Sequence, residues 1–289
     1  MKLFTALIFP LIHLFAFDAF ISPSELKNSL EEKNLIIIDV ASKDIYKKSH
    51  IINAIHVDIT SYIDDKSPYQ QMNTPEVIQE NLRKAGINTD SDIVIYAHNT
   101  PQGFLNSSYF ALILISHGFE NVTLLDGGYM AWVFEYPLLS STNKHTAQST
   151  GNYSVSKNEN ITVAAQYIKN EQNLTLLDSR TPAEYYGINK STGINMLGHI
   201  PGAKSSYYSY SFLKDSSLRN INELNKIYLN GFDLSQNSEI VVYADTVFSS
   251  SMVWYILYKK LGFKQTKIYE KSLKEWSDLH LNAKRFMWE

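Results

Sequence analysis

The chain has 289 residues, of which 44% are hydrophobic and 19% charged, and its formal net charge is −3. That length suits two domains of ordinary size, each with its own core. The negative balance argues against a nucleic-acid partner, because no surplus of lysine and arginine is available to neutralise phosphates. The chain contains no cysteine, which excludes a thiolate nucleophile, a persulfide, a disulfide and a cysteine metal site.

The first residues resemble a secretory signal peptide. Lys2 precedes an apolar run from Leu3 to Phe17 that stops at Asp18. Such a run is shorter than the roughly 20 residues of a membrane-spanning helix. We therefore predict that residues 1–19 are a signal peptide removed on export to the periplasm, leaving no stable membrane insertion. An uncleaved anchor and a buried first helix remain as alternatives.

Short apolar runs bounded by polar residues predict buried parallel strands in the first half of the chain. The first of these runs ends in an acid, and the second ends in a tyrosine. In chain order we expect strands at 35–39, 92–96 and 121–125, a helix at 107–117 stopped by Gly118, and a closing Trp132.

The second half repeats this order, with strands at 174–178, 239–243 and 267–269, a helix at 250–261 stopped by Gly262, and a closing Trp276. Matching landmarks lie at nearly constant separations, which indicates a duplicated unit. Asp39 and Asp178 are 139 residues apart, His50 and His199 are 149 apart, Tyr96 and Tyr243 are 147 apart, and Trp132 and Trp276 are 144 apart.

The alternation of strands and helices predicts an α/β fold in each half, with a central, mainly parallel sheet and helices on both faces. Residues 140–160 are rich in Ser, Thr and Asn and predict a surface connection. We place the domains at 20–139 and 155–289, with a linker at 140–154.

Two motifs carry a family resemblance: Asp178-Ser179-Arg180 with Glu184-Tyr185, and the turn from Gly198 to Ala203. Their order, and their echo in the first half, resemble the rhodanese family. The tandem arrangement is similar to thiosulfate and 3-mercaptopyruvate sulfurtransferases, over about residues 22–276. In active members, the resemblance implies, a cysteine begins the loop after the tyrosine-ending strand. Its thiolate carries sulfur from a donor to an acceptor.

This chain departs from the family at that loop. Ala244 stands where the nucleophile would be, and Asp245 adds a negative charge. The first-repeat loop also begins with alanine, at Ala97, and Lys271 replaces a preferred glycine before Ser272. We therefore expect no catalytic residue and no cofactor. The vestigial loop consists of Ala244, Asp245, Thr246, Val247, Phe248, Ser249 and Ser250.

Arg180 and Asp178 are the candidates for binding a small anion, because family members use this arginine to hold the donor. The alternative is a structural ion pair at a strand end. In the first repeat Ala41 occupies the arginine position, so Asp39 is expected to be structural.

The remaining polar candidates have structural interpretations. His50 and His199 are expected to make loop hydrogen bonds, since no spacing supplies further metal ligands. His98 is expected to be solvated, and a serine at 249–250 to cap the following helix. Asn173 lies in an extended glycosylation sequon, Glu171 to Thr175.

The sequence thus favours an exported, non-catalytic rhodanese-like protein that binds a small anion or a protein partner. The alternative is a thiosulfate or 3-mercaptopyruvate sulfurtransferase with weak or unconventional sulfur-transfer activity.

Overall fold

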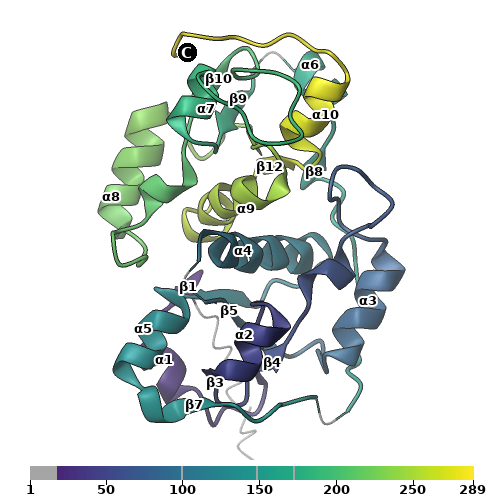
Figure 1. Cartoon of the computed structure of the whole chain (residues 1–289), viewed down its shortest axis with the longest axis vertical. Coiled ribbons are helices and arrows are strands. Elements are labelled where there is room, and N and C mark those ends of the chain that lie inside the picture. Colours follow the sequence, from purple (N-terminus) through teal and green to yellow (C-terminus); the bar gives the residue numbers. More distant parts are fainter. Residues whose placement is uncertain (1–17, 99, 148, 172) are drawn as a thin grey trace, which may run out of the picture.

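The computed structural model describes residues 18–98, 100–147, 149–171 and 173–289. The apolar run ending at Phe17, on which the signal-peptide prediction rests, lies outside this range. Within the described range, no helix has both the length and the apolar character needed to cross a bilayer. The chain forms two α/β halves stacked along its long axis (Figure 1).

The first half is built on a five-stranded parallel sheet in the order β1-β6-β5-β2-β4. Its elements are β1 (Phe20–Ile21), α1 (Pro23–Asn28), β2 (Leu35–Asp39), α2 (Lys43–Lys48), β3 (His50–Ile51), β4 (Ile55–His56), the 3-10 helix η1 (Ile59–Tyr62), α3 (Pro75–Lys84), β5 (Asp92–Tyr96), α4 (Pro101–Ser116), β6 (Val122–Leu125), α5 (Gly128–Glu135), the 3-10 helix η2 (Pro137–Leu139) and β7 (Ser140–Ser141).

The second half has the same strand order, β10-β9-β11-β12-β8, again all parallel. Its elements are β8 (Thr162–Val163), α6 (Ala165–Asn170), β9 (Thr175–Asp178), α7 (Pro182–Tyr186), β10 (Ala203–Ser205), the 3-10 helix η3 (Tyr208–Ser211), α8 (Ile221–Asn225) continued by the π-helix η4 (Lys226–Asn230), β11 (Ile240–Tyr243), α9 (Val247–Tyr255) continued by the π-helix η5 (Ile256–Lys260), β12 (Thr266–Tyr269) and α10 (Ser272–Asp278).

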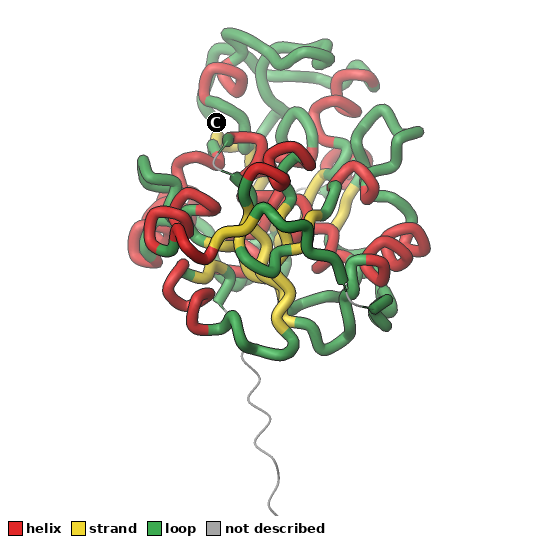
Figure 2. Tube along the Cα trace, turned by 60° about the horizontal axis from the view of Figure 1, so that its bottom comes forward, coloured by secondary structure: helices red, strands yellow, loops and turns green. Residues whose placement is uncertain are grey.

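The predicted α/β class and the duplication are therefore confirmed. The central strands β5 and β11 are buried along nearly their whole length, as apolar runs between two layers of helices require. Figure 2 shows the strands in the interior, flanked by helices.

Both long helices begin earlier than predicted. Helix α4 starts at Pro101, after Thr100, whose hydroxyl accepts the Gly103 N–H at 3.0 Å. Helix α9 starts at Val247, three residues before the predicted start. The prediction that a serine at 249–250 caps this helix is wrong, because Thr246 holds the N-cap position. The Ser250 hydroxyl instead donates to a carbonyl within the helix, that of Val247, at 2.9 Å.

The two halves share one hydrophobic cluster, which is centred on the contact between α4 and α9 (Figure 1). Small side chains let the helices approach: the buried hydroxyls of Ser108 and Ser251 lie 2.8 Å apart. Beside them the rings of Tyr109 and Phe248 meet edge to face, with centroids 4.7 Å apart. The halves consequently form one packed body.

After each closing tryptophan the chain turns back across its own domain. The Trp132 indole N–H donates to the Leu139 carbonyl at 3.3 Å, and that of Trp276 to Asn282 at 2.9 Å. In the first half the returning segment forms β7, which pairs antiparallel with β3. In the second half the return makes an antiparallel bridge between Lys284 and His199.

The connection between the halves is tied to the first domain. Tyr153 is buried, and its hydroxyl donates to the His117 carbonyl at 2.9 Å. The Gly151 N–H donates to the Arg83 carbonyl at 2.8 Å. Part of the predicted linker therefore contributes to the core.

Tyr255 on α9 provides a testable link between the halves. Its buried hydroxyl lies 2.6 Å from the Ala19 carbonyl and 3.2 Å from that of Val122, both in the first half. Tyr255→Phe should lower the free energy of unfolding by about 1 kcal/mol, the usual worth of a buried neutral hydrogen bond. Urea unfolding measures this. Tyr210→Phe, at a half-exposed tyrosine, is the control and should change nothing; an equal loss in both variants would contradict the assignment.

Candidate functional site

The candidate site forms where the carboxyl ends of β9 and β11 lie side by side. Asp178 and Tyr243 are the last residues of these strands and are register partners. The next residue on β9, Ser179, donates both its N–H and its hydroxyl to the Tyr243 carbonyl, each at 2.9 Å. This pairing brings the loop that starts at Ala244 against the Asp178-Ser179-Arg180 motif.

Arg180 is an interior residue, only 3% exposed. Its Nε and Nη2 bind the Asp178 carboxylate, with the shortest contact at 2.6 Å. Nη2 also donates to the Gly198 carbonyl at 2.8 Å, and Nη1 lies 3.4 Å from Oδ1 of Asp245. The guanidinium is thus bound within the chain. Asp178 and Arg180 form an ion pair, and Asp245 lies against the remaining nitrogen of the guanidinium.

Asp245 joins this pair to a second acid through one hydroxyl. Burial raises the pKa of Asp245, while Arg180 and a hydrogen bond to Ser191 oppose the rise. The Ser191 hydroxyl contacts Oδ2 of Asp245 and also Oε1 of Glu184, the latter at 2.7 Å. One hydroxyl proton cannot serve both carboxylates. Ser191 therefore lies between the two acids and links the Ala244 loop to α7.

Ala244 itself is enclosed, with 1% of its surface exposed. Its N–H donates to the Ser272 hydroxyl at 3.3 Å, and its carbonyl accepts from Leu273 at 2.9 Å. Only Ala244, Asp245 and Thr246 separate the strand from α9. The vestigial loop is therefore a short, closed turn whose remaining predicted members, from Val247 to Ser250, belong to the helix.

The tyrosine that ends each central strand has a structural task that the sequence did not reveal. Its hydroxyl accepts a hydrogen bond from the backbone N–H of the residue after His50 or His199. Ile51 donates to Tyr96 at 2.9 Å, and Ile200 donates to Tyr243 at 3.1 Å. In the sequence, only the recurrence of this tyrosine in both halves points to such a role. Nothing in the sequence indicates that Ser191 contacts Asp245 or that the Gly198 carbonyl accepts from Arg180.

The two motif histidines behave as predicted. His50 Nδ1 lies 2.7 Å from the Tyr46 carbonyl, and His199 Nδ1 lies 2.8 Å from that of Tyr185. Each imidazole also stacks on the ring of the tyrosine whose carbonyl it contacts. The ring centroids are 3.9 Å apart for His50 and Tyr46 and 3.8 Å apart for His199 and Tyr185. The described part of the chain holds no group of three or more His, Cys, Asp or Glu side chains placed to bind a metal.

The first repeat has different polar groups at this place. Ala41 replaces the arginine, and Nε2 of His98 lies 3.7 Å from Oδ2 of the buried Asp39. His98 also packs on the ring of Tyr129, with centroids 4.1 Å apart. The expectation of a solvated His98 is therefore wrong, because its imidazole occupies the place that Asp245 takes in the second repeat.

Asp245 gives a pH-dependent prediction. The pKa of this carboxyl in the folded protein is raised above its ordinary value of 3.8, so the folded state binds the proton more tightly than the unfolded state. Stability therefore falls as the pH rises from 3.8 through the folded pKa. Asp245→Asn removes the charge, keeps an oxygen acceptor for Arg180 and offers an amide N–H to the Ser191 hydroxyl. The variant should therefore unfold at a higher temperature than the parent at pH 7, and the difference should vanish below pH 3.8.

Thermal unfolding between pH 3 and 7 checks this, with Asp65→Asn at an exposed site as the control. A variant that is less stable than the parent at pH 7 would show that the ionised carboxylate is needed.

The sequence profile of the Rhodanese-like domain matches residues 22–135 and 162–279. The chain is 26% identical over 279 residues to the thiosulfate sulfurtransferase of Corynebacterium glutamicum, covering 91% of this chain and 88% of that protein. It is also 26% identical over 277 residues to the sulfur carrier protein TtuD of Thermus thermophilus, covering 91% and 94%.

Solved structures share the fold at lower identity. The anaerobic ergothioneine biosynthesis enzyme of Chlorobium limicola, solved with trimethyl histidine, superposes with a TM-score of 0.79 at 21% identity, covering 96% of this chain and 73% of that one. YnjE superposes at 0.78 with 18% identity, covering 92% and 69%. With the profile matched in both halves, the chain belongs to the rhodanese family as a tandem-domain member without a cysteine.

Proposed function

We propose that this chain is an exported, non-catalytic member of the rhodanese family that acts by binding a partner. The observation that carries the proposal is Ala244, enclosed at the position where the resemblance places the nucleophile. No side chain in this cysteine-free chain can form a persulfide. Removing the nucleophile of a serine protease lowers turnover about 10⁶-fold, which indicates the scale of the loss.

The surroundings of Ala244 also differ from those of a sulfur-transfer site. A loop leading into a helix can direct several N–H groups at an anionic sulfur. Here the Ala244 N–H is bonded to Ser272, and Asp245 places a carboxyl on Arg180. A small anion at Arg180 has to compete with this internal carboxyl. We therefore favour a protein partner, or an anion bound elsewhere, over an anion at Arg180.

The alternative function is sulfur transfer by an unconventional route, which the name of the Corynebacterium glutamicum relative supports. A single assay distinguishes the two functions. Transfer of sulfur from thiosulfate to cyanide by the purified chain would favour the enzyme and contradict the binding proposal.

We predict that the unmodified chain transfers no sulfur from thiosulfate to cyanide above background. Ala244→Cys should restore little activity, because an ionised Asp245 raises the pKa of the new thiol and repels an anionic donor. Ala244→Cys with Asp245→Gly should be more active, since it removes the acid and releases Arg180. Initial rates of the three proteins measure this, and equal rates in the two variants would show that Asp245 is not the obstacle.

The export part of the proposal is tested by the N-terminus of the protein from its producing cell. Lys2 and the following apolar run predict removal of about the first 19 residues. N-terminal sequencing should therefore begin at about Phe20. An intact Met1 on cytoplasmic protein would refute export.

A further inference from the structure

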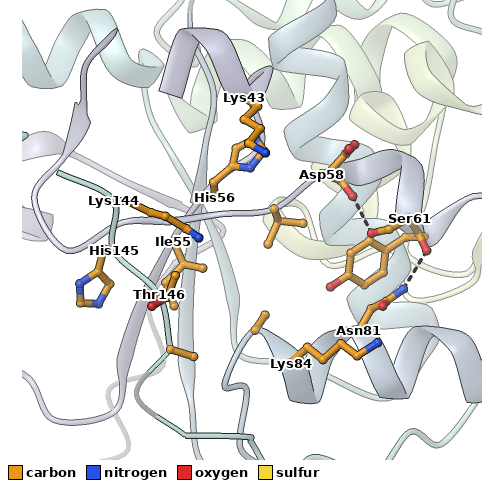
Figure 3. A pocket seen from close by; sticks show the side chains of 14 residues that line it. Lys43, Ile55, His56, Asp58, Ser61, Asn81, Lys84, Lys144, His145 and Thr146 are labelled. Atoms are coloured by element: carbon orange, nitrogen blue, oxygen red, sulfur yellow. Dashed lines mark hydrogen bonds between the residues drawn. The ribbon is translucent and has the colours of Figure 1, made fainter. Parts of the chain in front are cut away.

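A pocket of about 410 Å³ lies at the outer edge of the first sheet, away from the Ala244 loop. Four segments line it: the start of α2 at Lys43, the edge strand β4 with the turn that follows, helix α3, and linker residues 144–147. The linker closes the pocket because His145 bridges to Ile55 alongside β4. Figure 3 shows the Lys144 side chain extending from the linker toward Ile55, and Lys43 beside His56.

The lining is cationic, although the chain as a whole is negative. Three lysines, Lys43, Lys84 and Lys144, face one acid, Asp58, which gives a formal lining charge of +2 (three minus one) on a chain of net charge −3. Lys84 pairs with Glu80 at 2.5 Å. In the described part of the chain, no carboxylate lies within ion-pair distance of Lys43 or Lys144. These two ammonium groups remain available to a ligand.

The single acid in the pocket is already engaged. The Asp58 carboxylate caps η1, accepting the Thr60 N–H at 3.1 Å and the Thr60 hydroxyl at 2.7 Å. Its charge is therefore partly satisfied on the wall of the pocket and does not neutralise the two free lysines.

Tyr62 adds a polar group to the pocket wall. The residue is 2% exposed, and its hydroxyl makes no hydrogen bond to another described residue. Burial raises the pKa of this phenol well above its ordinary value, so the hydroxyl keeps its proton. It can donate that proton to a ligand oxygen in the pocket.

The second repeat has a pocket at the equivalent place, of about 380 Å³, which serves as an internal comparison. Pro182 begins α7 where Lys43 begins α2, and Ser205 pairs with Asp178 as His56 pairs with Asp39. The returning segment contributes the acid Glu289 in place of Lys144. The one lysine there, Lys204, donates to the Phe232 carbonyl at 3.1 Å. Of these two pockets, the first-repeat pocket is the more cationic, and two of its lysines have no ion-pair partner among the described residues.

We propose that the first-repeat pocket binds a small organic molecule that carries a phosphate or sulfate group. Lysines act as point charges suited to a tetrahedral oxyanion, whereas planar carboxylates favour the arginine fork, and no arginine lines the pocket. Ile55, Val57 and Ala85 offer an apolar wall for the body of the ligand. The volume lies in the range of small-molecule sites.

This site is separate from Ala244, so its test is independent of the sulfur-transfer assay. Isothermal titration of the full chain would use phenyl phosphate, phenyl sulfate and inorganic phosphate as probes. Phenyl phosphate should bind with one-to-one stoichiometry and more tightly than inorganic phosphate, because its ring contacts the apolar wall. Tighter binding of phenyl phosphate than of phenyl sulfate assigns the site to phosphate, and the reverse order assigns it to sulfate.

Two charge-matched double variants locate the site. Lys43→Gln with Lys144→Gln should weaken phenyl phosphate binding by about tenfold or more, as expected for the loss of charged hydrogen bonds. Lys27→Gln with Lys33→Gln removes the same charge from exposed lysines elsewhere and should leave the affinity unchanged. Tyr62→Phe should weaken binding while the unfolding temperature is retained.

An equal loss of phenyl phosphate affinity in the two double variants would overturn the proposal, because it would show that binding depends on the overall charge of the chain and not on the pocket. Absence of binding by all three probes at millimolar concentration would also overturn it. If the pocket double variant proved unfolded by circular dichroism, Lys144→Gln alone, in the exposed linker, would carry the same test.

Discussion

The buried charge at the edge of the second sheet is the constraint on which this half of the structure depends. Arg180 lies in the interior, where an unpaired guanidinium would be strongly destabilising. Asp178, the Gly198 carbonyl and Asp245 together satisfy it, and they come from three separate segments. One side chain thereby fixes the end of β9, the turn before β10 and the loop before α9.

The sequence predicted the fold well because the buried strands are strongly patterned. Each strand between two helical layers is an apolar run, and the same order of elements occurs twice, so each half supports the assignment of the other. The boundaries of α4 and α9 were missed because their first turns depend on capping geometry. Pro101 and Thr246 lie outside the apolar pattern of these helices, so hydrophobic periodicity does not mark where the helices begin.

The candidate site was predictable only in part. Ala244 could be placed by counting from the tyrosine, since the strand and loop keep the same register in both halves. The contact of Asp245 with Ser191 joins residues 54 apart, and no local pattern encodes it. The Asp39–His98 pair was missed for the same reason. It became visible only when the two loops were seen to occupy equivalent places.

The segments that turn back after Trp132 and Trp276 determine how the protein can be dissected. A fragment ending at residue 139 would lack β7, which pairs with β3, and would also lose Tyr153 from the core. A fragment that keeps these contacts of the first half has to extend through about residue 156, whose N–H donates to the His117 carbonyl at 2.9 Å. At the other end, Trp288 stacks on Tyr185, with ring centroids 5.2 Å apart. A fusion partner attached directly after this residue would disturb the stacking of Trp288 on Tyr185, so the attachment needs a flexible spacer.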